Sequence, residues 1–305
     1  MQTRIFPAKL NAAKMSPAAS AHHLVASVGA DPVVHLVDLT SGMSSHSLIG
    51  HKDEIMCVDW SDENEYILAT GSADGSIRIW DIRRAGAGAS IMSLDYTRVN
   101  AQGAATSETC YKEIFDAYNS DPFSDYRKRR RIEAPRASQV RPAHRGLVTA
   151  VRFFDSDRRV VSVGTDSKVR VWDSANGFDQ CIHFDGFSNP LQNQPTPLLV
   201  LQSCARATGS VSLVPNGKTG SIAAYCLATG KCLQHLKGHF VPPTCLAMRD
   251  DGGSRQIFSG GSDGFIICWS SVRETNAGAD VEGERVGEAL EADDDWEDSG
   301  SDNDA

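Results

Sequence analysis

The sequence lacks the features that mark several functional classes. No stretch approaches the roughly 18 uncharged apolar residues that cross a bilayer, and the opening residues MQTRIFP carry no apolar run typical of a signal peptide. The eight cysteines show no CxxC or His-paired spacing of a zinc site, and His22-His23 has no partner at metal-ligand spacing. We therefore predict no membrane span, no metal and no cofactor, and we expect the cysteines to be reduced thiols.

What the sequence does contain is an internal repeat. Three segments are alike: YILATGSADGSIRIWD (66–81), RVVSVGTDSKVRVWD (159–173) and QIFSGGSDGFIICWS (256–270). In each, an Asp in a tight turn precedes a Trp by six residues, and a His lies 22 to 24 residues before that Asp. This pattern resembles the signature of WD repeats, in which Gly-His and Trp-Asp bracket one blade of a β-propeller.

Two weaker copies lie between the strong ones. In residues 24–38, Val37 stands where the Trp would be, and in residues 210–230, Tyr225 does, with Thr219 in place of the turn Asp. The five Trp-equivalent positions are 43, 92, 53 and 44 residues apart, and a blade takes about 40–45 residues. The sequence therefore predicts an all-β WD-repeat propeller of about five four-stranded blades, with one long insertion.

Each strong repeat carries four residues that we expect to form a hydrogen-bonded tetrad of His, hydroxyl, Asp and Trp. Three copies of one constellation indicate architecture, so a nucleophilic triad of His51, Thr70 and Asp74 is disfavoured and we predict no enzyme activity. A buried polar network of this kind stiffens a blade when every group is satisfied. The predicted tetrads are His51, Thr70, Asp74 and Trp80; His144, Ser162, Asp166 and Trp172; and His239, Ser259, Asp263 and Trp269.

Charge divides the chain further. From Glu274 to the end there are 13 acidic residues and one basic residue, a net −12, which leaves +3 for the rest of a chain of net charge −9 (−9 + 12). A segment so charged cannot bury enough apolar surface to fold alone. We predict propeller blades over residues 1–272, interrupted by a flexible insertion at about 96–142, and a disordered acidic tail over 273–305.

The insertion contains a run of five basic residues. It is either part of a solvated loop or a signal for nuclear entry or a nucleic-acid patch. The run itself has no interleaved aromatics to stack on bases, so sequence-specific nucleic-acid binding is not expected. We predict a nuclear protein whose nuclear signal is Arg127, Lys128, Arg129, Arg130 and Arg131.

A closer resemblance emerges from residues 47–85, from VGTDSKVRVWDSANG (163–177), from the LKGHF and IFSGGSDGFIICW blocks, and from the acidic end with its embedded Trp. These are similar to the family of the Cockayne syndrome group A protein, and the degenerate fourth repeat matches as well. The resemblance implies a seven-bladed substrate receptor of a cullin–RING ubiquitin ligase. Such receptors bind the adaptor called damaged DNA-binding protein one and serve transcription-coupled nucleotide-excision repair, with repair or transcription proteins as clients.

Ile79-Trp80-Asp81-Ile82-Arg83 resembles the WDxR box of adaptor-binding WD proteins, and no other repeat carries the Arg. We predict Trp80, Asp81 and Arg83 as the partner-binding residues, because a guanidinium can fork to carboxylate or carbonyl groups. The alternative is a general nuclear WD scaffold for histone or RNA-processing complexes, without a ligase role.

Closure of the ring is the last expectation. The family has about two further blades and a helical N-terminal segment, and this chain begins too late to include them. The fifth blade lacks an outer strand, and Gln2–Phe6 is the N-terminal candidate to supply it. We expect an open arc in which Gln2–Phe6 is not paired with Phe265–Trp269.

Overall fold

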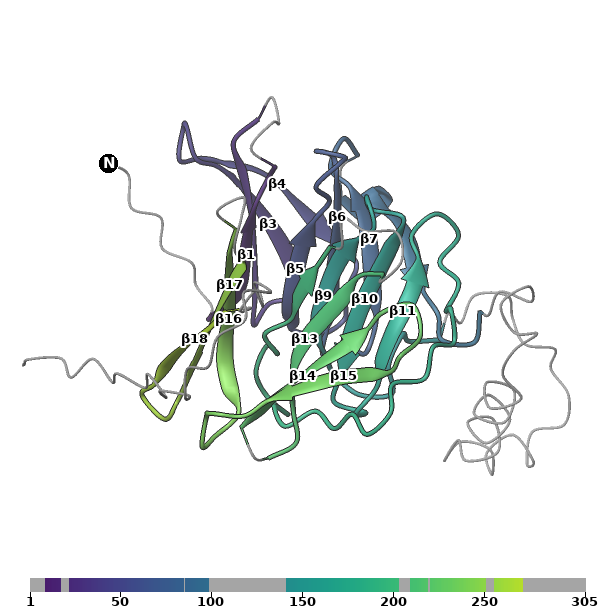
Figure 1. Cartoon of the computed structure of the whole chain (residues 1–305). Helices are drawn as coiled ribbons and strands as arrows, with labels where there is room; N and C mark the ends of the chain where they lie inside the picture. The colour runs from purple at the N-terminus through teal and green to yellow at the C-terminus, as the bar shows by residue number, and fades with distance from the viewer. Residues whose placement is uncertain are drawn as a thin grey trace, which may run out of the picture. The chain divides into compact units, whose positions relative to one another are not determined.

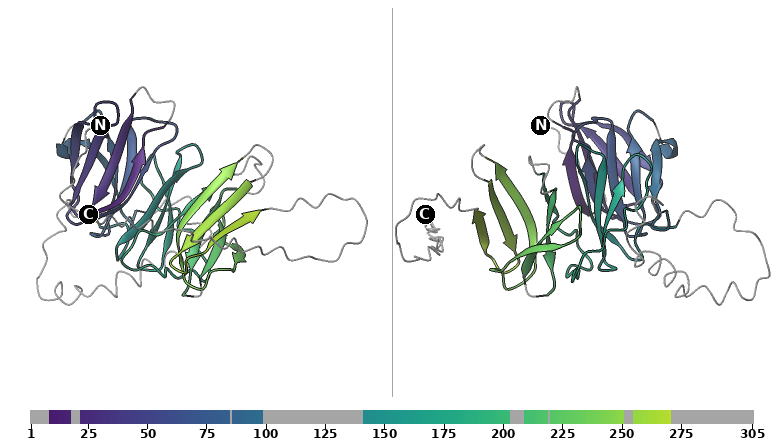
Figure 2. Two further views of the ribbon diagram at one scale, coloured as in Figure 1. Left: turned by 90° about the vertical axis from the view of Figure 1, so that its left-hand side faces the viewer. Right: turned by 45° about the vertical axis from the view of Figure 1, so that its right-hand side comes forward.

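The described part of the chain consists of five antiparallel β-sheets that follow one another in sequence (Figure 1). The computed structural model describes residues 9–17, 22–84, 86–98, 141–202, 209–218, 220–250 and 255–270. The chain divides into two units, Met1–Ser270 and Ser271–Ala305, and all five sheets belong to the first. Figure 2 shows the same sheets from two further sides. The prediction of an all-β WD-repeat propeller is confirmed.

Within each sheet the strands pair in chain order. The first sheet contains β1 (Leu10–Met15), β2 (Leu24–Gly29), β3 (Val33–Asp38) and β4 (Ser44–Ile49), and the second contains β5 (Ile55–Trp60), β6 (Ile67–Ser72), β7 (Ile77–Asp81) and β8 (Ser90–Leu94). The third contains β9 (Val148–Phe154), β10 (Arg159–Gly164) and β11 (Val169–Asp173). The fourth contains β12 (Leu199–Leu201), β13 (Val211–Asn216), β14 (Ser221–Cys226) and β15 (Cys232–Leu236), and the fifth contains β16 (Pro243–Asp250), β17 (Arg255–Gly261) and β18 (Ile266–Ser270). A short 3-10 helix, η1 (Gly86–Ala89), precedes β8.

The second sheet shows why these residues form these strands. Its strands are rich in β-branched and aromatic residues that suit a pleated, buried surface, and every residue of β5 is buried. A tight turn between β6 and β7 places Gly75 at φ 78°, a left-handed conformation that glycine adopts without strain. The sequence pattern predicts strands at 55–61, 66–72, 77–82 and 90–95, and the four strands of this sheet begin and end within one residue of these ranges.

Neighbouring sheets pack face to face through apolar side chains. Ala26, Leu36 and Leu48 of the first sheet meet Trp60 and Trp80 of the second. In the same way Cys57, Ile77 and Ile79 of the second sheet pack with Val148 and Phe153 of the third. The second sheet buries both of its faces in this arrangement, so its strands β5, β6 and β7 are buried nearly throughout.

A buried carboxylate adds a polar connection between three sheets. Asp59 of β5 accepts a hydrogen bond from the Phe153 backbone N–H (2.8 Å) and forms ion pairs with Arg152 of β9 (2.8 Å) and Lys14 of β1 (3.1 Å). Its side chain is 5% exposed, whereas those of Arg152 and Lys14 are 38% and 35% exposed. The two cations keep their hydration, and the buried carboxylate is both hydrogen-bonded and ion-paired. A buried charge is tolerated under these conditions.

The third sheet departs from the expectation of four strands per blade. In the described residues it has three strands. The outer strand, β11, makes only one isolated β-bridge on its free side, between Trp172 and Asp179. The segment after β11 turns instead at Asp179, whose carboxylate accepts from Arg170 (2.7 Å) and whose own backbone N–H is bonded to the carbonyl of Arg98 (2.8 Å). Three prolines at 190, 195 and 197 follow, and they favour an irregular connection over a ladder.

The cysteines only partly match the expected reduced thiols. The five described free cysteines (Cys57, Cys226, Cys232, Cys245 and Cys268) all lie in strands. Cys181, by contrast, is disulfide-bonded, so the expectation is wrong there. It lies in the irregular connection after β11, at φ 53°, outside the strand ladders.

The fifth sheet buries one face. Leu246, Ile257 and Trp269 pack against the fourth sheet. On the opposite face lie Cys245 and Cys268, both exposed, and Ile266, which is 81% exposed. The ladder of the described residues ends at β18, and Gln2–Phe6 lies outside them, so the prediction on ring closure is untested. No helix among the described residues is long and apolar enough to span a membrane.

Candidate functional site: the sheet tetrads and the Arg83 surface

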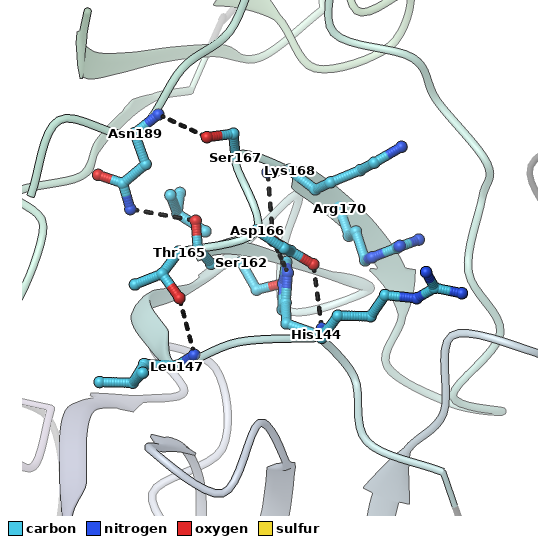
Figure 3. A network of polar contacts seen from close by, with 12 residues as sticks. His144, Leu147, Ser162, Thr165, Asp166, Ser167, Lys168, Arg170 and Asn189 are labelled. Atoms are coloured by element: carbon cyan, nitrogen blue, oxygen red, sulfur yellow. Dashed lines mark hydrogen bonds and ion pairs between the residues drawn. The ribbon is translucent and has the colours of Figure 1, made fainter. Parts of the chain in front are cut away.

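The third sheet brings its four predicted tetrad residues into one hydrogen-bonded chain. Trp172 Nε1 donates to Ser162 Oγ (2.8 Å), Ser162 Oγ meets His144 Nε2 (2.8 Å), and His144 Nδ1 meets Asp166 Oδ1 (2.9 Å). Figure 3 shows His144, Ser162 and Asp166 of this tetrad. An ionised carboxylate only accepts, so Nδ1 carries the proton and Nε2 accepts from the serine hydroxyl. His144, Ser162 and Trp172 are fully buried.

The fifth sheet repeats this geometry. Trp269 Nε1 donates to Ser259 Oγ (2.8 Å), which meets His239 Nε2 at 2.8 Å, and His239 Nδ1 lies 2.9 Å from Asp263 Oδ2. The hydrogen bonds among Trp, Ser, His and Asp are therefore the same in both sheets, although the fifth sheet is far more exposed.

The second sheet differs at one link. Trp80 Nε1 and His51 Nε2 share the Thr70 hydroxyl at 2.8 and 2.7 Å. His51 Nδ1, however, lies 3.0 Å from Ser76 Oγ and 3.5 Å from Asp74 Oδ2. Ser76 in turn donates to Asp74, so it shares the position next to the imidazole. The fixed spacing of His, hydroxyl, Asp and Trp did not predict Ser76. Its position two residues after the turn Asp is nevertheless a signal for a hydrogen bond to that Asp.

Each tetrad Asp also ties two loops together. The backbone N–H that follows the His donates to its carboxylate: Lys52 to Asp74 (2.9 Å), Arg145 to Asp166 (3.1 Å) and Phe240 to Asp263 (3.1 Å). The turn and the connection that enters the sheet are thus held at one end of the blade.

These contacts determine the ionisation of the Asp and His side chains of the tetrads. Burial raises the pKa of the Asp166 carboxyl, but His144, Arg170 and the Arg145 N–H outweigh it and lower the pKa to about 2. Burial likewise opposes ionisation of Asp74, whose bonds from His51 and Ser76 hold its pKa well below the ordinary value. Burial lowers the pKa of His51, which favours the neutral imidazole that accepts from Thr70.

The two degenerate sheets use other groups. In the fourth, the Tyr225 hydroxyl accepts from Asn216 Nδ2 (3.1 Å) and donates to the Asp185 carbonyl (3.2 Å). Sequence reasoning missed Asn216, and Thr219 lies outside the described residues. In the first, Val37 makes no such bond, and His35 pairs instead with the turn residue Asp31 at 2.7 Å.

Arg83 lies just beyond β7 with its side chain 60% exposed. Its guanidinium forks onto Asp81, with Nε 2.9 Å from Oδ1 and Nη2 2.7 Å from Oδ2, and its Cζ lies 4.9 Å from the Tyr66 ring centre. The hydrogen bonds from Arg83 hold the pKa of the Asp81 carboxyl below its usual value. The guanidinium is therefore already engaged in part by its own chain, and Trp80 is fully buried.

Other predicted features are placed differently. The basic run at 127–131 lies outside the described residues. His22 lies against Trp60 and Tyr66, with ring centres 6.0 and 5.8 Å away. Within the described ranges no group of His, Cys, Asp and Glu could hold a metal ion.

Comparison with known proteins agrees with the repeats. The WD domain, G-beta repeat, matches residues 42–81, 136–173 and 230–270, each span ending at or next to a tetrad Trp. Together with the five sheets, these matches define a WD-repeat β-propeller protein.

The chain is also similar to individual relatives. It is 27% identical to the WD repeat-containing protein ATCSA-1 of Arabidopsis thaliana, over 96% of this chain and 68% of that protein. It is 45% identical over 47 residues to ribosome biogenesis protein YTM1 of Saccharomyces cerevisiae, covering 15% of this chain and 10% of that one. The ribosome biogenesis protein WDR12 homolog of Ixodes scapularis is 28% identical over 42% of this chain and 28% of its own length.

Proposed function

We propose that this WD-repeat protein is a nuclear substrate receptor of a cullin–RING ubiquitin ligase that acts in transcription-coupled nucleotide-excision repair. Three features support the proposal: the family resemblance of residues 47–85 and 163–177, the likeness to ATCSA-1 over 96% of the chain, and Arg83 in its WDxR context. The partner at Arg83 would be the adaptor called damaged DNA-binding protein one. The clients would be repair or transcription proteins.

The geometry of Arg83 carries the proposal. Asp81 and Tyr66 hold the guanidinium from one side, and 60% of the side chain faces solvent. A side chain already fixed in place loses little conformational entropy when a partner binds. Pre-ordered arginines on a protein surface are also frequent energetic centres of interfaces. A carboxylate or carbonyl of the adaptor could bind Nη1, which has no bond to Asp81.

The test is affinity purification of adaptor and cullin with the Arg83→Ala and Arg83→Lys variants. Both should recover at least tenfold less adaptor than the wild type, because a point charge does not replace a fork. Arg159→Ala is the matched control, since Arg159 pairs with Asp155 (3.2 Å) and lies over the Phe154 ring (6.0 Å) on another sheet. Equal adaptor recovery by the wild type and both Arg83 variants would reject Arg83 as the adaptor contact, and failure of the wild type to recover adaptor or cullin would reject the ligase proposal.

The second candidate is a nuclear WD scaffold for RNA-processing or histone complexes with no ligase role. The likeness of short segments to YTM1 and to the WDR12 homolog, both named for ribosome biogenesis, supports it. Purification that recovers ribosome-assembly proteins and neither adaptor nor cullin would favour this candidate.

A further inference from the structure

Two exposed phenylalanines meet at one end of the fifth sheet. Phe240 directly follows the tetrad residue His239, and Phe265 lies in the turn between β17 and β18. Their ring centres are 6.0 Å apart, and they are 77% and 48% exposed. Val241 beside them is 37% exposed. Exposed aromatics in contact are unusual on a soluble surface and mark sites that bind something.

The pair is held rigidly by the tetrad beneath it. Asp263 accepts the backbone N–H of Phe240 at Oδ2 (3.1 Å) and that of Phe265 at Oδ1 (3.2 Å). The same carboxylate accepts from His239, so the anchor is itself fixed. A binding surface on such a base needs little reorganisation.

Comparison between repeats shows that the tetrad does not require aromatics here. The position after the His is Lys52 in the second sheet and Arg145 in the third. The position two residues after the turn Asp is Ser76 and Lys168. The architecture therefore folds with polar residues at both places, and the two phenylalanines of the fifth sheet serve something other than folding.

Cations lie on the segments next to the pair. A Cβ on Gly220 would meet the carbonyl oxygens of His239 and Val241 at 2.4 and 2.8 Å, so the turn between β13 and β14 lies against this connection. Lys218 in that turn is exposed, and so is Lys237, three residues before Phe240. Lys218 and Lys237 therefore give the two segments beside the aromatic pair exposed positive charge, and the Asp263 carboxylate is taken up by hydrogen bonds from His239 and the Phe240 N–H.

We propose that Phe240 and Phe265 form an aromatic docking site for an acidic peptide segment of a partner protein that carries one large apolar side chain. The apolar side chain packs on the two rings, and Lys218 and Lys237 attract the flanking carboxylates. The site does not depend on Arg83 or on a ligase role, because it lies on a different sheet.

The experiment measures fluorescence anisotropy of labelled synthetic peptides with the full-length chain. The first probe has Glu and Asp residues on both sides of one central Phe. A second has Ala in place of that Phe, and a third has Lys in place of each acid. The first should bind most tightly, the second at least tenfold more weakly, and the third not at all. Binding of the first should weaken as salt rises.

Variants of the protein assign the binding to the site. Phe240→Ala/Phe265→Ala should weaken binding of the first peptide at least tenfold, and Lys218→Glu/Lys237→Glu should weaken it and reverse its salt dependence, because salt screens the new repulsion. Phe240→Arg/Phe265→Lys installs the pair that the third sheet carries, so it should fold normally and lose the preference for the peptide with the central Phe. Leu233→Ala, which removes another exposed apolar side chain (59%) on the neighbouring sheet, is the control and should bind like the wild type. Equal binding by the phenylalanine variants, or no preference for the central Phe, would overturn the proposal.

Discussion

At the residue scale, the Ser162 hydroxyl serves two buried nitrogens at once, Trp172 Nε1 and His144 Nε2. Ser162→Ala should leave both without a partner and lower the free energy of unfolding by about 2–4 kcal/mol. Ser212 of β13 is the matched control, since it is equally buried and its hydroxyl has no hydrogen-bond partner among the described residues. Ser212→Ala should be neutral or slightly stabilising. Urea unfolding of the two variants checks this, and similar midpoints would mean that the tetrad is not a source of stability.

His51 gives the stability a pH dependence. Its folded pKa is depressed from the ordinary 6.5, chiefly by burial, so its contribution is fully present above 6.5. As pH falls from 7.5 to 5.5, the unfolded chain takes up a proton that folded His51 resists, and the free energy of unfolding should fall. The depressed pKa values of Asp74 and Asp166 affect the free energy of unfolding at lower pH, where it falls further below about pH 4. Urea unfolding at several pH values should show a flatter profile for His51→Gln, whereas His183→Gln, at an exposed histidine, should leave the profile unchanged.

The residues of the tetrads could be predicted because Asp, Trp, His and hydroxyl recur at fixed spacing. The spacing does not reveal which neighbour competes for the same nitrogen, so Ser76 was missed. Nor does it show where an exposed arginine points: Arg83 meets Asp81 because the two lie two residues apart at the end of one strand. Asn216 and Tyr225 replace a tetrad with different chemistry, and no repeat of that pair exists to identify it.

At the scale of elements, the sequence pattern predicts strands at 210–215, 221–227 and 232–237 in the fourth sheet, and β13, β14 and β15 lie within one residue of these ranges. β1, of sequence LNAAKM, was missed because it carries small and polar residues and is largely exposed. Its place depends on distant contacts instead. It pairs with β2, and Asn11 Nδ2 donates to the Ile55 carbonyl of β5 at 3.0 Å. Such pairing is decided by tertiary structure, which overrides local propensity.

Asp59 is where coupling between elements can be tested. Asp59→Ala removes the acceptor of the buried Phe153 N–H and the counter-charge of Arg152 and Lys14, so the free energy of unfolding should fall by about 2–4 kcal/mol. Amide hydrogen exchange should rise together in β1 and β9, which both contact this carboxylate. Asp155→Asn breaks an exposed pair with Arg159 and should cost less than about 0.5 kcal/mol. Exchange that rises only in β5 would show that the sheets are not coupled through Asp59.

At the scale of the whole molecule, the last described sheet can be compared with an earlier one. Ile77 and Ile266 hold the same position, three residues after the turn Asp. Ile77 is fully buried against the third sheet, whereas Ile266 is 81% exposed on a face that also carries Cys245 and Cys268. The fifth sheet therefore presents a face of the kind that other sheets bury against their neighbour. An exposed apolar face of this sort promotes association.

A pair of identical substitutions determines whether that face is covered in solution. Ile77→Asp places a charge in a closed apolar interface and should destabilise the fold by more than about 4 kcal/mol. Ile266→Asp should change the free energy of unfolding by less than about 0.5 kcal/mol and should reduce self-association measured by light scattering, if the arc is open as expected. Equal destabilisation by the two substitutions would mean that the fifth sheet is covered in the folded protein. Cross-linking from Cys268 would then distinguish Gln2–Phe6 of the same chain from a second copy as the covering segment.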